Sequence, residues 1–266
     1  MTEFNLRLKA SVDANKFRYG YPWIYSNEII SDRRTKSLLP GSFCKLVDYN
    51  KSPVCLVTVN PKSKIFARVM DFNFETTVDA YWLKDKISKA LAKRKEIFRD
   101  PFYRLVNAEA DELPGLIVDR FDNVIVMQPN AFWAENMIEI IANSIKEVCS
   151  IDVVIKNASG RSRRLEGLDD KNSVFFGDLP EAAISVPMNG AIYKADVHEG
   201  QKTGLFYDQR QNHKFVASLA NGKTVLDVFC HVGGFGLAAI AAGASKVSFV
   251  DSSANALDLV REGASE

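Results

Sequence analysis

Short apolar runs separated by turn residues occupy the first quarter of the chain, and longer patterns follow. Strands are predicted at 42–49, 53–60 and 64–70, with turn residues between them. A series of short strands of this kind is typical of a small β-barrel. We therefore predict such a barrel within residues 1–73.

Beyond this region, helical spacing alternates with strand-like runs. Apolar side chains recur every three or four residues over 81–99, which predicts a helix. The pattern then predicts a strand at 122–130, a helix at 132–148 and a further strand at 152–158. This alternation is typical of α/β structure.

Two more segments precede the last part of the chain. Residues 184–197 carry Asn189-Gly190 between two arms of alternating apolar residues, the strongest short-range signal for a β-hairpin. We expect this hairpin to bridge into the last domain. Residues 161–170 are charged and predict a loop that exposes Arg161, Arg163 and Arg164.

The last part reads as a strand, a glycine turn, a helix and a second strand. The run TVLDVF ends in CHVGGFG, a helical segment covers 237–242, and an apolar run follows at 247–250. This order is the first βαβ unit of a doubly wound nucleotide-binding sheet. Such a sheet has about six strands. We therefore expect most of this domain to be missing and the apolar faces of its two strands to lack neighbours.

An acidic residue ends the second strand of this unit. Asp251 follows Asp227 of the first strand by 24 residues. That spacing fits a carboxylate that accepts the ribose hydroxyls of an adenosine. The turn GGFG differs from the GxGxxG of dinucleotide enzymes, which disfavours NAD and FAD.

Four stretches of sequence together resemble one family. They are RLKASVDANKFRYGYPWIYSNEI (7–29), NAEADELPGLIVDRF (107–121), GQKTGLFYDQRQNH (200–213) and DVFCHVGGFGLAA (227–239). Over nearly its whole length the chain resembles the RlmI-type class I methyltransferases, which use S-adenosylmethionine (SAM) to methylate cytosine C5 of 23S ribosomal RNA. The resemblance implies SAM as cofactor and ribosomal RNA as partner, and it leaves a homodimer open.

The resemblance implies a multi-domain fold of α/β and α+β type. Residues 1–73 correspond to a PUA-like RNA-binding β-barrel and 74–197 to a central α/β domain that ends in the hairpin. Residues 198–266 correspond to the N-terminal, incomplete part of a Rossmann-like SAM methyltransferase domain.

The glycine turn and the strand ends are expected to hold the cofactor. Gly233 and Gly234 would let the turn pass beneath its methionine end, and Asp227 could reach the ammonium group. Asp251 is the candidate for the ribose, with Ser252 beside the adenine.

Two aromatic residues and a second segment complete the expected cofactor site. Phe229 and Phe235 either line the pocket or belong to the core. His231-Val232 stands where the family has Tyr-Thr, which removes a hydroxyl from the turn. By resemblance, a lip over the methionine moiety consists of Lys202, Thr203, Gly204, Phe206, Asp208, Gln209 and Arg210.

The net charge of +1 hides an asymmetry. Residues 1–100 contain 19 Lys and Arg against 11 Asp and Glu, whereas the remainder contains 15 against 22. A basic first part suits contact with phosphates, although lysines are also common on solvated faces. The barrel cations are Arg7, Lys9, Lys16, Arg18, Arg33, Arg34, Lys36, Lys62 and Lys64. Those of the 81–99 helix are Lys84, Lys86, Lys89, Lys93, Lys95 and Arg99.

Aromatic residues in the barrel have two interpretations. Tyr21, Trp23 and Tyr25 could stack on bases. Packing is the favoured interpretation for Trp23, which follows a proline in a strand-like segment.

The sequence shows neither a secretory signal nor an apolar run long enough for a membrane span, so we expect a cytoplasmic protein without membrane contact. Cys44, Cys55, Cys149 and Cys230 lack CxxC spacing and predict reduced thiols. No metal site is expected, because His198, His213 and His231 are isolated. Glu109, Asp111 and Asp119 are interpreted as structural carboxylates rather than a paired catalytic site.

Methylation at cytosine C5 needs a Cys thiolate that attacks C6. By resemblance, that Cys and an Asp-Pro-Pro motif follow the first βαβ unit, and neither occurs in these 266 residues. Cys230, in the cofactor turn, is a poor nucleophile candidate. We therefore expect the catalytic residues downstream and this chain to be inactive alone. The alternatives are a non-catalytic RNA-binding fragment and a SAM-dependent methyltransferase for another base or substrate.

Overall fold

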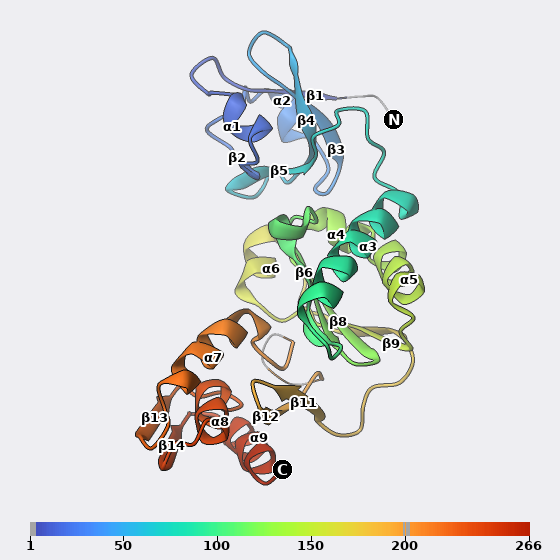
Figure 1. The fold of residues 1–266 in the computed structure, drawn as a ribbon. Helices are drawn as coiled ribbons and strands as arrows, with labels where there is room; N and C mark the ends of the chain where they lie inside the picture. Colours follow the sequence, from blue (N-terminus) through green and yellow to red (C-terminus); the bar gives the residue numbers. More distant parts are fainter. Residues whose placement is uncertain (1–3, 199, 201–202) are drawn as a thin grey trace.

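The computed structural model describes residues 4–198, 200 and 203–266, and it has the expected α/β and α+β organisation (Figure 1). The N-terminal domain is a five-stranded sheet in the order β1-β3-β4-β5-β2. A bridge between Leu8 and Ile29 links the chain just after β1 to the chain after β2, which brings the sheet edges together. The strands are β1 (Asn5–Arg7), β2 (Trp23–Tyr25), β3 (Phe43–Val47), β4 (Pro53–Val59) and β5 (Ile65–Asp71).

Two short helices, α1 (Asn15–Arg18) and α2 (Arg33–Lys36), accompany this sheet. Asp32 and Thr35 form a reciprocal capping box at the start of α2, which satisfies its first backbone N–H groups. The core of the domain is apolar and includes Leu6, Phe17, Ile24, Leu46, Cys55 and Val57.

The central domain is built on a second five-stranded sheet, in the order β10-β9-β8-β7-β6. Neighbouring strands are antiparallel except β8 and β9, which run parallel. The strands are β6 (Phe102–Asn107), β7 (Leu116–Phe121), β8 (Val124–Pro129), β9 (Val153–Lys156) and β10 (Ser173–Phe176).

Alternate residues of the central sheet face two different cores. Ile125 and Met127 of β8 belong to a core shared with the helices α3 (Ala80–Ile97) and α5 (Ile138–Cys149), which pack side by side on one face (Figure 1). Val126, between them, belongs to a core on the other face that reaches the C-terminal elements. The period of two along a strand thus lets one sheet join two parts of the molecule.

Two elements of the central domain differ from the sequence prediction. The helix expected at 132–148 is interrupted at Met137, which separates α4 (Phe132–Asn136) from α5. The segment expected to be an exposed loop contains a helix, α6 (Arg161–Glu166). Arg163 is fully buried there rather than exposed, because its guanidinium bonds Glu135 and the backbone oxygen of Pro129.

The predicted hairpin is present as β11 (Ile184–Met188) and β12 (Ala191–Ala195). Asn189 and Gly190 both have positive φ, the conformation that a two-residue type I′ turn requires. The Tyr193 hydroxyl donates to the Gly234 backbone oxygen at 3.1 Å, and β12 packs against α8 (Gly234–Ala241) and α9 (Ala254–Ala264). The hairpin is therefore packed against the C-terminal elements.

The C-terminal elements form the expected βαβ unit. β13 (Thr224–Val228) pairs in parallel with β14 (Lys246–Val250), with α8 between them in the chain. η2 (Tyr207–Gln209) and α7 (Arg210–Ser218) precede this pair. Leu226 of β13 is 64% exposed, and Val228 and Val250 are also exposed, as expected for strands without further neighbours. The domain limits at residues 73 and 197 stay predictions.

Candidate functional site

The glycine turn lies between β13 and α8. Gly233 caps the helix with φ +81°, a conformation that side chains with a Cβ rarely adopt. A Cβ at this position would also lie 3.0 Å from Leu237 and 3.1 Å from Val260. Backbone conformation therefore favours glycine here, and a Cβ would in addition crowd the Leu237 and Val260 side chains.

The next glycine faces a buried histidine. A Cβ on Gly234 would lie 2.5 Å from Cε1 of His213, a residue of α7. The His213 ring also stacks near Tyr193 and meets Phe235 edge-on, with ring centroids 4.5 Å apart. Burial lowers the pKa of His213 to about 4, so the imidazole is neutral under ordinary conditions. The sequence indicated no such role for this histidine.

Asp227, in β13, stabilises the glycine turn through a hydrogen bond to the backbone of α8. Its Oδ2 accepts a hydrogen bond of 2.8 Å from the Gly236 backbone N–H, and the carboxylate is buried. Burial raises the pKa of Asp227, which the backbone hydrogen bonds partly oppose. This oxygen ties β13 to the first turn of α8. Contact of Asp227 with a methionine ammonium stays a prediction.

Asp251 follows β14 at the carboxyl edge of the sheet. Its Oδ2 accepts from the His231 backbone N–H at 2.8 Å, and Oδ1 accepts from Ser253 N–H at 2.9 Å. These backbone hydrogen bonds, first that of Ser253, lower the pKa of the carboxyl group. Each oxygen of the ionised group keeps acceptor capacity for a further donor.

A cleft of about 380 Å³ opens beside Asp251. Of the residues predicted to bind the cofactor, Gly204, Asp251 and Ser252 line it. The other lining residues are not among those predicted to bind the cofactor. Two of them, His231 and Val232, are the pair that stands where the family has Tyr-Thr. The others are Asp196, Gly200, Ser253, Asn255, Ala256 and Leu259.

The two phenylalanines of the turn have different surroundings. Phe229 has φ +59° and is 87% exposed, and it does not line the cleft. Phe235 packs on His213. Phe206, from the predicted lip, meets the His231 ring edge-on at 4.8 Å between centroids and so lies next to the cleft. Whether any of these rings touches the cofactor stays a prediction.

Much of the predicted lip contacts the central domain instead of the cleft. Thr203 is fully buried, and its hydroxyl donates to Asp119 Oδ2 at 2.6 Å. Asp119 is also fully buried, and its carboxylate accepts hydrogen bonds from Nε and Nη2 of Arg104 at 2.9 and 3.1 Å. Asp208 lies 3.7 Å from the same guanidinium. The motifs around Asp119 and Thr203, 84 residues apart in sequence, are thus joined through one buried carboxylate.

Two other members of the predicted lip, and Tyr207 within the same segment, have partners as well. Arg210 Nη1 donates to the Phe102 backbone oxygen at 2.8 Å, and Gln209 Oε1 accepts from Asn212. The intervening Tyr207 donates its hydroxyl to the Arg120 backbone oxygen at 3.1 Å. These contacts fix the segment that carries Gly204 to the cleft. Lys202, predicted for the same lip, lies outside the described residues.

The described part of the chain shows neither a metal centre nor a reactive thiol. Within the described residues, His, Cys, Asp and Glu side chains form no group that could hold a metal ion. All four cysteines are buried. Burial raises the pKa of Cys44 and Cys55 to about 12 and that of Cys149 to about 11. Cys230 is shifted in the same direction, so thiols rather than thiolates are present at neutral pH.

Comparison with known proteins finds a family match for each end of the chain. Residues 6–72 match a PUA-like domain, and residues 160–264 match the S-adenosylmethionine-dependent methyltransferase family. The C-terminal part of the chain is therefore similar to SAM-dependent methyltransferases, and the N-terminal part is similar to PUA-like domains.

More narrowly, the chain is similar in sequence to ribosomal RNA large subunit methyltransferase I. It is 34% identical to that protein from Shewanella frigidimarina over 91% of this chain and 62% of the relative. It is 33% identical to a ribosomal RNA large subunit methyltransferase from Deinococcus radiodurans, over 95% of this chain and 64% of the relative. The chain thus spans less than two thirds of the length of these relatives.

Solved structures share the fold. A protein from Streptococcus mutans described as a SAM-dependent methyltransferase superposes with a TM-score of 0.82 at 18% identity, over 98% of this chain and 66% of that one. A methyltransferase solved with S-adenosylhomocysteine gives 0.81 at 18% identity, over 99% and 66%. No helix in the described part of the chain is long and apolar enough to cross a membrane.

Proposed function

We propose that residues 1–266 belong to a longer enzyme that methylates ribosomal RNA with SAM as the methyl donor. The observation that carries this proposal is the cleft at the carboxyl edge of β13 and β14, where ligands bind in doubly wound sheets. Its volume lies within the range of small-molecule sites. The carboxylate of Asp251 supplies ionised acceptors at its rim, so the residues present fit an adenosyl group.

Each part of the cleft has a separate task in this proposal. Asp251 accepts hydrogen bonds from the ribose hydroxyls, and Ser252 lies beside the adenine. Gly233 lets the chain turn closely enough for the methionine end to pass over it. Gly204 is held at the cleft by the contacts of its neighbours with the central domain. SAM, when bound, supplies an electrophilic methyl group.

The finer proposal is methylation of cytosine C5 in 23S ribosomal RNA. It is supported by the relatives named ribosomal RNA large subunit methyltransferase I. This chemistry requires an accessible thiolate, which the four buried cysteines do not supply. We therefore propose that residues 1–266 bind cofactor and RNA but do not complete the transfer by themselves. A role in RNA binding alone is the second candidate, supported by the PUA-like domain.

The assignment of Asp251 can be tested with a matched aspartate on the following helix. Asp258 is exposed and pairs only with Arg261 among the described residues. Asp251→Ala should weaken binding of S-adenosylhomocysteine by about 10- to 100-fold, because charge-assisted hydrogen bonds contribute about 1.5–3 kcal/mol. Asp258→Ala should leave affinity unchanged. Calorimetric titration of both full-length variants compares them, and equal affinities would remove Asp251 from the site.

A further inference from the structure

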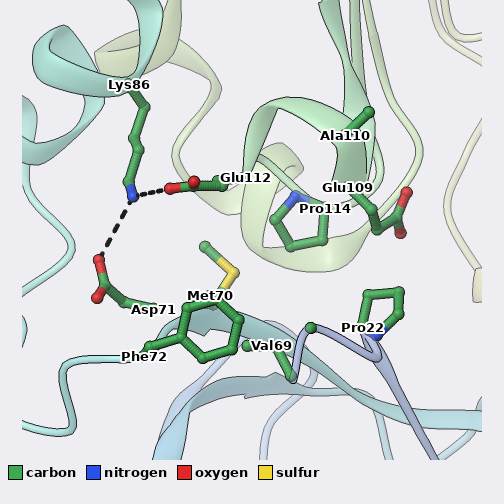
Figure 2. Close-up of a pocket in the computed structure, with 11 residues that line it drawn as sticks. Pro22, Val69, Met70, Asp71, Phe72, Lys86, Glu109, Ala110, Glu112 and Pro114 are labelled. Atoms are coloured by element: carbon green, nitrogen blue, oxygen red, sulfur yellow. Dashed lines mark hydrogen bonds and ion pairs between the residues drawn. The ribbon is translucent and has the colours of Figure 1, made fainter. Parts of the chain in front are cut away.

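Two pockets flank the junction between the PUA-like domain and the central domain, and Glu109 lines both. The first, of about 300 Å³, is drawn in Figure 2. Its single cation, Lys86, bonds Glu112 and lies 3.7 Å from Asp71 (Figure 2). Carboxylates outnumber cations in this pocket, so it does not suit a phosphate.

The second pocket, here called the junction cleft, has the opposite charge balance. It has a volume of about 750 Å³, and its charged side chains are four cations against two carboxylates. The cations are Lys62, Lys64, Arg68 and Arg161, and the carboxylates are Glu109 and Glu166. The pocket on the opposite side of Glu109 therefore serves as an internal comparison.

Both carboxylates of the junction cleft already have hydrogen-bond or ion-pair partners within the protein. Glu166 is buried and accepts from Asn60 Nδ2 at 2.6 Å, from Ser63 Oγ at 3.2 Å and from Arg68. Glu109 accepts from the other side of the same guanidinium, with Arg68 Nη1 3.3 Å from its Oε1. Arg68 is therefore neutralised between two carboxylates.

The other three cations are left for a ligand. Lys62, Lys64 and Arg161 are exposed, and none has an ion-pair partner among the described residues. Lys62 and Lys64 lie between β4 and β5 of the PUA-like domain, whereas Arg161 begins α6 of the central domain. The two domains thus each contribute charge to one cleft.

Hydrogen bonds fix the two sides of the cleft relative to each other. Glu166, at the end of α6, binds Asn60 and Ser63 on the segment that carries the two lysines. On the wall, Trp23 donates its indole N–H to Glu109 at 2.8 Å, which fixes the ring. The backbone segments that carry the cations are thus held in place beside an aromatic ring, which reduces the ordering cost of binding.

We propose that the junction cleft binds a single-stranded segment of RNA, with its phosphates on Lys62, Lys64 and Arg161 and a base against Trp23. This inference rests on the proposed function, which supplies the RNA. Cations along a groove with an aromatic platform are what sequence-independent binding of single strands requires. An acidic peptide would use the cations, but its acidic side chains offer no aromatic ring to stack on the indole.

The charge contribution is tested by removing the three free cations together. Lys62→Ala, Lys64→Ala and Arg161→Ala are combined in one variant. The control combines Lys51→Ala, Lys171→Ala and Lys223→Ala, which remove the same charge from exposed positions outside the cleft that are not among the barrel cations. Fluorescence anisotropy with a labelled single-stranded RNA of mixed sequence measures affinity at several salt concentrations.

The cleft variant should reduce the slope of log K against log salt by about 2 and weaken binding by up to about 100-fold at 0.1 M salt, at ~0.7 per phosphate contact. The control should lose less than about threefold. RNA should quench tryptophan fluorescence, and Trp23→Phe should abolish the quenching, because Trp82 and Trp133 pack edge-to-face in the central domain.

The outcomes separate this inference from the function on which it rests. Wild-type protein that binds no RNA would remove both. RNA binding that survives the cleft substitutions, or falls equally in the control, would overturn the inference alone. Displacement of the RNA by polyglutamate at equal charge concentration would also overturn it, in favour of an acidic protein partner.

Discussion

At the residue scale, the aspartates of the candidate site and its surroundings differ in which hydrogen-bond donors their carboxylates already bind. Asp119 and Asp227 are buried and hold the fold together through Arg104, Thr203 and a backbone N–H. Asp251 is less buried, binds only backbone N–H groups among the described residues and faces a cleft. A carboxylate with remaining acceptor capacity at a sheet edge is the one that can serve a ligand.

Because Gly234 lies against His213, we can predict whether Gly234→Ala raises or lowers the free energy of unfolding. Gly to Ala in a helix ordinarily stabilises by about 0.5–1 kcal/mol. Here a Cβ would lie 2.5 Å from the imidazole, so Gly234→Ala should lower the midpoint of urea unfolding. In a His213→Ala background the same change should be neutral or stabilising. A double-mutant cycle measures the coupling, and additive effects would mean that the ring is not the obstacle.

His213 should also make stability depend on pH. Its pKa is about 4 in the fold, below the usual 6.5, so the unfolded chain binds the proton more readily. Stability is fully present above pH 6.5 and is lost as pH falls towards 4, by up to about 3 kcal/mol at 1.36 kcal/mol per pH unit. Urea unfolding of wild type and His213→Phe across this range should show a smaller loss in the variant. Parallel curves would contradict the assignment.

At the element scale, the sequence predicted those elements that depend on interactions between residues close together in the chain. Asn189-Gly190 predicted a hairpin, and the apolar spacing of 81–99 predicted α3, because turn conformation and one-sided burial leave direct traces in sequence. Arg163 was predicted to be exposed and is buried, since Glu135, 28 residues away, supplies its partner. Long-range pairing of this kind has no local signal.

In the candidate site, too, some residues were recognisable from local spacing and others were not. Asp251 and the glycine turn were recognisable from strand–turn–helix spacing, and both lie where that spacing predicts. The segment 203–210 was recognisable only by resemblance. Its contacts with Arg104 and Asp119 depend on how two domains pack, which periodicity does not encode.

The hydroxyl of Thr203 should hold this segment on the central domain. Thr203→Val keeps the shape of the side chain but removes the donor to the buried Asp119 carboxylate. A hydrogen bond to a charged group contributes about 1.5–3 kcal/mol, so amide exchange over residues 203–210 should accelerate by about 10- to 100-fold. Thr224→Val, at an exposed position of β13, is the control. Unchanged exchange in Thr203→Val would show that other contacts hold the segment.

At the scale of the whole molecule, two cores connect the sheets of the PUA-like, central and C-terminal parts, and so link the proposed RNA site to the proposed cofactor site. The junction cleft lies between the PUA-like and central domains, and the cleft beside Asp251, proposed to hold the cofactor, is lined by residues of the βαβ unit and by Asp196, Gly200 and Gly204. The PUA-like domain and the βαβ unit lie at opposite ends of the molecule, with the central domain between them (Figure 1). The central sheet contributes one face to each core. It therefore sets the distance between the proposed RNA and cofactor sites.

Methyl transfer tests the central claim most directly. Full-length protein is incubated with tritiated SAM and unmodified 23S ribosomal RNA, and the labelled nucleotide is identified by mass spectrometry. We expect tritium at cytosine C5, a loss of at least about tenfold in Asp251→Ala at limiting SAM, and no transfer by the polypeptide of residues 1–266. RNA that stays unlabelled under conditions where the protein binds S-adenosylhomocysteine would contradict the account.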